Sequence, residues 1–501
     1  MIHTSRVYAT LALVYLAGPT PTAAQASDCD CAAVLTWTAA YLERNYPGFL
    51  DKVTSATRAE HDALRDRLTR AAATAANDDA CGPILEEYIA WFRDPHTVIR
   101  RAGLGALPND PNAIRARFAD WPSRTVSEAE VRDRTARSAP AGDALDGIWE
   151  IAGANYRLAM APGEDPGSWQ AVVLEADSVW WVPGQIKGSF QRTGPGEFVA
   201  ETYRANHDAV HDTARLQNGV LRLSGGGAWV RAWPDNPSGY DRARYDASAN
   251  RSLAVRQLDD HTMLVQIPTF DPGQAERIDS IIDANWHHLT GTPNLIIDVR
   301  GNGGGGDRSF QALRPLLYTG PVVTKGLSTY ATEDNINSLL RIVRDTPLPG
   351  DVRAEIDSMI AEMRVRPGEL VGQPPDTTTL DSTLSQPQRI AVLTDRFCAS
   401  SCEAFILVAR QSEKVTVYGE NTGGFMDYGN TLPVQSPCPA FVLHQPVSRS
   451  NHLAERAYDN IGLQPEVHVP DDVVYWLEWV HERLADPGTV DSGRPVGARD
   501  G

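Results

Sequence analysis

A serine at position 400 combines a residue type and a sequence context that suit covalent chemistry. It lies in RIAVLTDRFCASSCEAFILVAR (389–410), where an apolar run typical of a strand ends in a short polar turn. Apolar residues at helical spacing follow, so Ser400 is predicted at the amino end of a helix. Unpaired backbone N–H groups there favour developing negative charge, as acyl transfer to a hydroxyl nucleophile requires. A serine that only caps a helix has the same context, so this segment alone leaves both interpretations open.

A glycine-rich segment upstream offers further backbone donors. In NLIIDVRGNGGGG (294–306) an apolar strand ends in a run of glycines. Glycines let the backbone approach a ligand closely and turn its N–H groups towards an anion. The spacing fits neither a Walker loop nor a dinucleotide fingerprint. A flexible turn is the alternative interpretation.

Together the two segments resemble the S41 family of serine peptidases, which includes C-terminal processing peptidases and the tricorn protease core. The resemblance covers roughly residues 250–470 and a short piece upstream. In that family the nucleophile lies three residues before a motif glutamate. The matching glutamate is Glu403, which implies Ser400 rather than Ser401 as the nucleophile and leaves Glu403 a supporting role. The resemblance also implies oxyanion donors from the backbone of Gly303, Gly304 and Ser401.

The family has two kinds of proton acceptor, and the lysine kind is disfavoured in this chain. Processing peptidases carry a lysine in a Gly-Lys-Gly segment after the strand that follows the serine helix. The matching stretch is YGENTGGFMDYG (418–429), where Phe425 occupies the lysine position. The chain has four lysines, and Lys414 lies too close in sequence to the serine helix to serve.

The tricorn-like branch implies a histidine base with an orienting carboxylate. Its histidine lies in a D-x-H motif, which Asp94-Pro95-His96-Thr97 matches. Imidazole accepts the serine proton near neutral pH, and a carboxylate fixes its tautomer. The family's orienting glutamate precedes a G-[VIL]-x-P-[DE] segment. Here Asp459 stands before GLQPE (462–466), with Glu455 as the alternative acid.

Hydrophobic periodicity divides the chain into segments of different character. Residues 29–100 have helical spacing, 146–235 alternate as short strands rich in tryptophan, and strands alternate with helices from about 250. The expected fold class is mixed α/β with several domains. The resemblance implies a spiral catalytic domain of the ClpP/crotonase type, so His96 and Ser400 are predicted to come from different domains. The predicted segments are a signal peptide (1–26), a helical domain with connector (27–140), an antiparallel barrel-like β domain (141–238), the catalytic domain (245–488) and a disordered tail (489–501).

The amino terminus and the cysteines indicate export to the periplasm or outside the cell. Residues 1–26 have a positive start, a short apolar core and a small-residue cleavage site, and the core is too short for a membrane span. Six cysteines follow, an even number that suits disulfides in an oxidising compartment. The expected groupings are Cys29 or Cys31 with Cys81, and Cys398 or Cys402 with Cys438. Zinc is the weaker alternative, because the chain has no CxxC pair.

These inferences predict an exported serine endopeptidase that acts on peptides or proteins through an acyl-enzyme, without metal or organic cofactor. The formal charge of −18 argues against nucleic acid as a partner. No membrane span is expected in the mature protein, and the oligomeric state stays open. The alternatives are an inactive protein of the same fold that binds an apolar ligand or peptide, and an esterase or amidase with the same triad.

Overall fold

The computed structural model describes most of the chain as two compact units. A sheet unit comprises residues 1–105, 251–468 and 483–501, and a barrel unit comprises residues 106–250 and 469–482. The predicted signal peptide and the predicted tail lie outside the described residues. The described residues are 29–101, 110–137, 144–248, 252–345, 348, 350–372 and 374–485.

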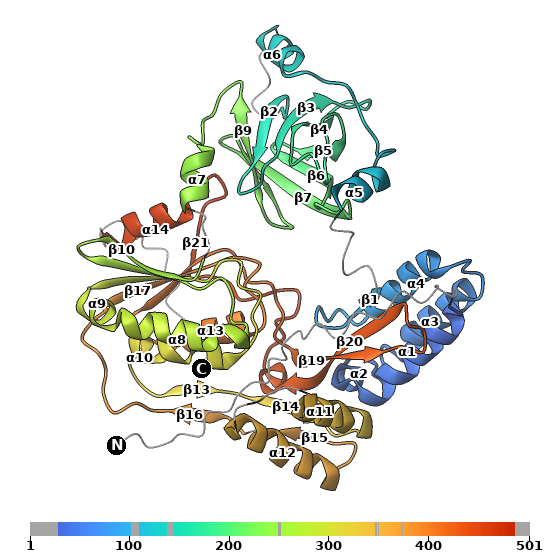
Figure 1. Ribbon diagram of the computed structural model, residues 1–501, viewed down its shortest axis with the longest axis vertical. Coiled ribbons are helices and arrows are strands. Elements are labelled where there is room, and N and C mark those ends of the chain that lie inside the picture. Colours follow the sequence, from blue (N-terminus) through green and yellow to red (C-terminus); the bar gives the residue numbers. More distant parts are fainter. Residues whose placement is uncertain are drawn as a thin grey trace. The chain divides into compact units, whose positions relative to one another are not determined.

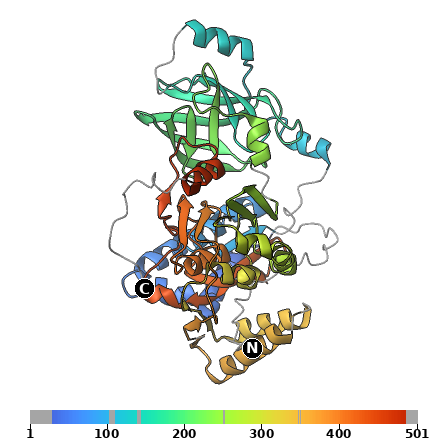
Figure 2. The ribbon, with the colours of Figure 1, turned by 90° about the vertical axis from the view of Figure 1, so that its left-hand side faces the viewer.

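The barrel unit is built around a closed barrel of eight antiparallel strands (Figures 1 and 2). Its first strand pairs with its last, so the sheet closes on itself. Four tryptophans, Trp149, Trp169, Trp181 and Trp229, are buried in its core, so these aromatic side chains serve packing. The strands are β2 (Gly147–Ile151), β3 (Arg157–Pro162), β4 (Ser168–Glu175), β5 (Ile186–Gly194), β6 (Glu197–Tyr203), β7 (Ala209–Gln217), β8 (Val220–Leu223) and β9 (Ala228–Trp233).

Four helices belong wholly or mostly to the barrel unit. They are α5 (Pro111–Arg117), α6 (Glu128–Arg137), α7 (Arg242–Ser248) and α14 (Trp476–Ala485). The last lies close to the barrel core, because Val474 packs with Val220 and Tyr240 just before it begins.

A six-stranded sheet in the order β10-β11-β12-β17-β18-β21 forms the centre of the sheet unit. Strands β11 to β21 are parallel, and β10 adds an antiparallel edge. Side chains of β12 and β17 are almost all buried, as expected for parallel strands covered by helices. The strands are β10 (Ala254–Asp259), β11 (Thr262–Gln266), β12 (Asn294–Asp298), β17 (Arg389–Thr394), β18 (Val415–Gly419) and β21 (Val467–His468).

Helices α8, α10 and α13 lie together beside this sheet in Figure 1 and share one hydrophobic core with it. The core includes Ile278 and Ile282 of α8 and Phe405 and Ile406 of α13. These elements hold the carboxyl ends of the parallel strands in place, where open α/β sheets carry their sites. The bounds are η1 (Pro272–Gln274), α8 (Ala275–Ala284), α9 (Trp286–Gly291), η2 (Asp307–Leu313), α10 (Arg314–Leu317) and α13 (Ser401–Ala409).

A second sheet joins the amino-terminal helices to the rest of the sheet unit. Strand β20 pairs with β1, β14 and β19, so residues from both ends of the chain share one sheet (Figure 1). Asp51 strengthens the junction, since its carboxylate accepts from Tyr428 Oη at 3.0 Å and from Arg449 Nε at 2.8 Å. The strands are β1 (Val98–Arg101), β14 (Leu327–Tyr330), β15 (Leu370–Gly372), β19 (Tyr428–Gln435) and β20 (Phe441–Ser450).

The amino-terminal helices therefore pack as part of the sheet unit, whereas we predicted a helical domain of their own. Their buried apolar residues form one core with Phe441 and Leu443 of β20. The separation of His96 and Ser400 into different domains is consequently wrong, because both belong to the sheet unit. The helices are α1 (Cys31–Asn45), α2 (Pro47–Lys52), α3 (Arg58–Ala72) and α4 (Asp78–Ala90).

A helical pair with its own small core completes the sheet unit. Helices α11 (Glu333–Asp345) and α12 (Gly350–Val365) pack together through Leu339, Val343, Ile356 and Ile360. A short two-stranded sheet joins β13 (Val322–Thr324) to β16 (Asp376–Thr378), and η3 (Asn451–Ala454) follows β20. Among the described residues no helix is both long and apolar enough to cross a membrane.

All six cysteines form disulfides, and one predicted grouping is wrong. Cys31 pairs with Cys81, as one of the expected alternatives. Cys438 pairs with Cys29 instead of with Cys398 or Cys402, which pair with each other. The reason is tertiary, because the β19–β20 hairpin packs against the amino-terminal helices and carries Cys438 away from the serine helix.

The mixed α/β class, the antiparallel barrel and the helical amino-terminal region are thus confirmed.

Candidate active site

Ser400 occupies a sharp turn between β17 and α13. Its backbone has φ +56° and ψ −120°, a combination that is rare for a residue other than glycine. It is the residue before the first turn of α13, as its sequence context predicts. Strained backbone of this kind persists only where the surroundings hold it, and it concentrates at functional sites.

The glycine loop after β12 packs directly against this turn. Gly304 has φ +89°, and a Cβ atom there would lie 2.5 Å from the Ala399 carbonyl oxygen and 3.0 Å from Ser400 Cβ. Ala399 also donates its N–H to the Asn302 carbonyl oxygen at 3.1 Å. The need for glycine at position 304 is therefore a need for close approach between two backbones.

Two of the predicted oxyanion donors remain without a hydrogen-bond partner within the described ranges. Gly304 is not one of them, because its N–H donates to Asn302 Oδ1 at 2.9 Å. The N–H groups of Gly303 and Ser401 donate to no atom of the residues that the structure describes. Ser401 is the first residue of α13, where the N–H groups have no partner inside the helix. The predicted role of Gly304 as donor is thus corrected to one of close packing.

Glu403 lies fully buried beneath Ser400 and accepts four hydrogen bonds. Its Oε2 accepts from the N–H of Ser400 at 3.0 Å and of Phe425 at 2.7 Å. Its Oε1 accepts from Thr422 Oγ1 at 2.5 Å and from the Gly424 N–H at 2.9 Å. Burial raises the pKa of Glu403, and these donors oppose the rise. The carboxylate fixes the serine turn and the 422–425 segment to one another.

His96 lies in the turn just before β1 and faces Phe425. The two rings pack edge to face with centroids 5.3 Å apart. Asp94 shapes the turn that carries His96, because Oδ1 accepts from the His96 N–H at 2.9 Å and Oδ2 accepts from Tyr46 Oη at 2.6 Å. Burial lowers the pKa of His96 below its usual range, which favours the neutral imidazole that a general base requires.

Asp459 is buried and keeps one carboxylate oxygen unpaired. Its Oδ1 accepts from the N–H groups of Met426 and Asp427, both at 2.9 Å, while Oδ2 has no partner in the described part of the chain. Nδ1 of His96 is likewise buried and unpaired among these residues. Burial, then the nearby carboxylates of Asp94 and Asp427, raise the pKa of Asp459 to about 8.

One segment, residues 422–428, contacts His96 and Asp459 directly and is linked to Ser400 through the Glu403 carboxylate. Phe425 contributes its N–H to Glu403 under Ser400 and its ring to His96. The next two N–H groups hold Asp459. This short segment therefore links the histidine, the acid and the turn that carries the serine.

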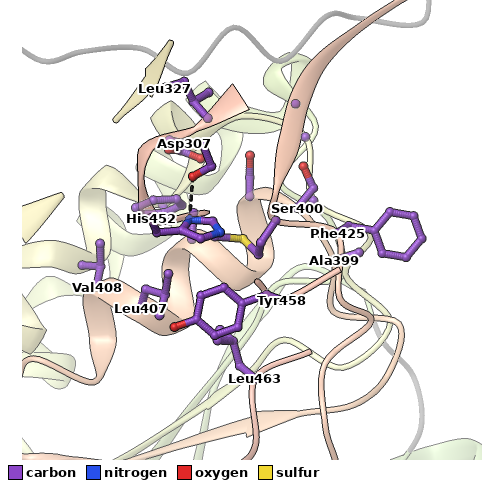
Figure 3. A pocket seen from close by; sticks show the side chains of 18 of the residues that line it. Asp307, Leu327, Ala399, Ser400, Leu407, Val408, Phe425, His452, Tyr458 and Leu463 are labelled. Carbon is purple, nitrogen blue, oxygen red and sulfur yellow. Dashed lines mark hydrogen bonds between the residues drawn. The ribbon is translucent and has the colours of Figure 1, made fainter. Parts of the chain in front are cut away.

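The glycine loop, Ser400 and His96 line one groove of the sheet unit with a volume of about 3000 Å³. Figure 3 shows Ser400 and Phe425 at this groove, together with the apolar side chains of Leu407, Tyr458 and Leu463. An extended apolar wall beside Ser400 suits the side chains of a long ligand.

The alternative acid and the lysines have other partners. Glu455 forms an ion pair with Lys325, and its side chain is 62% exposed. Lys414 donates to the Leu384 carbonyl oxygen at 2.6 Å, and Lys52 donates to the Phe92 carbonyl oxygen at 2.6 Å. The fourth lysine, Lys187, belongs to the barrel unit.

Sequence reasoning missed two residues behind Asp459. Asp427 accepts the N–H groups of Tyr458 at 2.8 Å and Asp459 at 3.2 Å, and its Oδ1 lies 3.1 Å from His452 Nε2. His452 also contacts Ser450 Oγ through Nδ1 at 2.5 Å. No motif marks them, and only the pairing of β19 with β20 brings them side by side.

A comparison with protein families matches residues 261–469 to peptidase family S41. Residues 261–469 belong to peptidase family S41. The match covers the parallel strands β11 to β21 with the glycine loop, Ser400 and Asp459, so this part of the chain falls in a family of serine peptidases. His96 lies outside the matched residues.

Solved structures resemble this S41 chain distantly. The structure of mature CPAF is 12% identical over 90% of this chain and 95% of that chain, with a TM-score of 0.46. A putative peptidase from Parabacteroides merdae is 14% identical over 93% and 100% of the two chains, with a TM-score of 0.44. The photosystem II D1 C-terminal processing protease is 14% identical over 91% and 98%, with a TM-score of 0.37. A comparison with curated proteins gave no match.

Proposed function

We propose that this S41 chain is an exported serine endopeptidase with Ser400 as nucleophile and His96 as general base. Ser400 Oγ attacks the peptide carbonyl while His96 accepts its proton, and Asp459 stabilises the resulting imidazolium. The Gly303 and Ser401 N–H groups hold the oxyanion, and water then hydrolyses the acyl-enzyme. The observation that supports this proposal is that residues 422–428 contact His96 and Asp459 directly and share the Glu403 carboxylate with the Ser400 N–H.

The protonation states support the assignment of roles. Burial lowers the pKa of His96, so the imidazole is neutral and ready to accept a proton near neutral pH. The pKa of Asp459 is raised to about 8, so its carboxyl group is mostly protonated near neutral pH. A positive charge on the His96 imidazole would favour ionisation of this carboxyl group, and the carboxylate would in turn stabilise the imidazolium. The unpaired His96 Nδ1 and Asp459 Oδ2 are the two atoms that this step would join.

The size of the groove supports a peptide chain rather than a small ester. Small-molecule sites have volumes of roughly 300–1,000 Å³. The groove beside Ser400 measures about 3000 Å³. Its apolar wall includes Leu407 and Tyr458 (Figure 3). A polymeric substrate would use this space, whereas a small ester would leave most of it empty.

Three disulfides support the proposed export. They join cysteines that are buried, apart from the partly buried Cys29, and such bonds persist in oxidising compartments. The signal-like pattern of residues 1–26 points in the same direction.

The test is reaction with a fluorophosphonate probe, combined with cleavage of an unfolded protein substrate. We expect mass spectrometry to find the probe on Ser400, and both labelling and cleavage to be lost in Ser400→Ala and in His96→Ala. Ser382→Ala and His261→Ala are matched controls, because both side chains are exposed and lie outside the groove. Cleavage that survives Ser400→Ala refutes the mechanism.

The alternatives have distinct outcomes in the same experiment. A binding protein of the same fold gives neither labelling nor cleavage. An esterase or amidase gives labelling of Ser400 and turnover of small esters or amides, without cleavage of the unfolded protein.

A further inference from the structure

A disulfide spans the turn that carries the proposed nucleophile. Cys398 and Cys402 are four residues apart and bonded to each other, so the bridge closes a small ring that contains Ser400. Both cysteines are fully buried. Cys398 belongs to the turn after β17, and Cys402 is the second residue of α13.

Backbone hydrogen bonds connect the two bridged cysteines to the segments around the serine turn. The Cys398 N–H donates to the Asp395 carbonyl oxygen at 2.9 Å, and the Cys398 carbonyl oxygen accepts from the Gly423 N–H at 2.8 Å. The Cys402 N–H donates to the Ala399 carbonyl oxygen at 3.0 Å. Gly423 belongs to the segment 422–428, which reaches His96 and Asp459, and Ala399 is the residue against which Gly304 packs.

The ring encloses a backbone that needs restraint. Ser400 has a positive φ of 56°, and its turn is held by the Glu403 carboxylate and by the close approach of Gly304. Strained residues relax when their surroundings loosen, and a small displacement of a nucleophile reduces its reaction rate strongly. A covalent bond between the residues on either side limits the conformations available to the turn.

Because the ring is small, the Cys398–Cys402 disulfide is expected to contribute little to the overall stability of the protein. A disulfide restricts the unfolded chain more when it closes a longer loop. Cys398–Cys402 spans four residues, whereas Cys31–Cys81 spans fifty and joins α1 to α4. The shorter bridge therefore constrains the unfolded chain least and the native turn most.

We propose that the Cys398–Cys402 disulfide is a positioning element that holds Ser400 in its reactive conformation against the glycine loop. This inference rests on the proposed function of Ser400. Its effect falls on the chemical step, because the bridge is buried beneath the turn and neither cysteine lines the groove.

The test compares two full-length double variants, Cys398→Ala/Cys402→Ala and Cys31→Ala/Cys81→Ala. Each lacks one disulfide, and the second is the matched control because its bridge lies away from the groove. We expect the first variant to react with the fluorophosphonate roughly ten- to a hundredfold more slowly, with a similar loss of kcat and an unchanged KM. We expect the control to lose more stability towards urea and to keep its labelling rate under conditions where it is folded.

A second measurement does not depend on catalysis. Hydrogen exchange of the backbone amides of residues 399–403 is expected to accelerate in the first variant and to stay unchanged in the control. Wild-type protein without labelling at Ser400 refutes the proposed function. If the wild-type protein is labelled at Ser400 and the Cys398→Ala/Cys402→Ala variant matches it in labelling rate and in hydrogen exchange, the inference about the disulfide is overturned while the proposed function stands.

If the alanine pair does not yield folded protein, the bridge is opened in the wild-type protein with a phosphine. The phosphine is oxidised to its oxide with the oxygen of a water molecule, whose two protons go to the two sulfurs as thiols. Free thiols at Cys398 and Cys402 are followed by mass spectrometry alongside labelling of Ser400. We expect the labelling rate to fall as these thiols appear. Undiminished labelling after complete opening of this bridge overturns the inference.

Discussion

Replacing Asp459 by asparagine is expected to stabilise the fold at alkaline pH while it abolishes activity. The Asp459 carboxylate is buried near two other carboxylates, Asp94 and Asp427, and burial together with these charges raises its pKa to about 8. Ionisation of Asp459 therefore opposes folding, although an orienting carboxylate must ionise to stabilise the imidazolium. Asparagine removes the charge and keeps the Oδ1 acceptor for the Met426 and Asp427 N–H groups.

The magnitude follows from the difference between the folded and unfolded pKa values. An acid whose pKa is raised on folding binds its proton more tightly in the folded state, so stability is lost as pH rises. The window runs from the ordinary value of 3.8 to the folded value of about 8. At pH 9 the penalty is on the order of 5 kcal/mol, and at pH 3 it is close to zero. The unpaired amide nitrogen that Asp459→Asn introduces costs about 1–3 kcal/mol at every pH, so the pH dependence is the informative quantity.

The assay is urea unfolding of wild type and Asp459→Asn at a series of pH values between 4 and 9 (roughly the window above). We expect the free energy of unfolding of the variant to gain on that of the wild type by a few kcal/mol across this range. Asp260→Asn, at an exposed aspartate, is the control and should show no such gain. The loss of activity in Asp459→Asn should reach about 10⁴-fold in kcat.

A difference in unfolding free energy that does not change with pH would refute the account of Asp459. Full activity in Asp459→Asn would separately remove this residue from the proposed triad.

Three further predictions concern the surroundings of Ser400. Glu403→Gln leaves at least one buried N–H group without an acceptor, so urea unfolding should show a loss of about 1–3 kcal/mol and labelling of Ser400 should slow; Glu43→Gln, on the exposed face of α1, should change neither quantity. Gly304→Ala places a Cβ 2.5 Å from a backbone oxygen, so thermal unfolding should show a clear loss of stability, whereas Gly303→Ala, which faces open space, should unfold near the wild-type temperature. Lys325→Met should keep kcat within about twofold of wild type, because this groove-lining lysine is paired with an exposed acid rather than with the serine; a large loss of kcat would favour a serine–lysine mechanism.

The predictable parts of the fold are those with strong local patterns. Alternation between glycines over 146–235 predicts an antiparallel barrel, and the apolar runs of β12 and β17 predict buried parallel strands. The position of the amino-terminal helices was not predictable in this way. Their apolar faces show that they pack against something, but not that the partner is β20 at the far end of the chain.

The candidate site likewise has features that local sequence predicts and features that only the tertiary structure sets. The sequence by itself determined the strand–turn–helix position of Ser400, the proposed nucleophile, since this position needs only local structure, and it singled out His96 and Asp459 as candidates through motifs. Tertiary structure alone decided that Gly304 is a packing residue, that Glu455 is paired at the surface, and that a disulfide spans the nucleophile. The physical reason is that backbone conformation follows from neighbours in sequence, whereas hydrogen-bond partners, burial and disulfide pairing depend on which distant segments the sheets bring together.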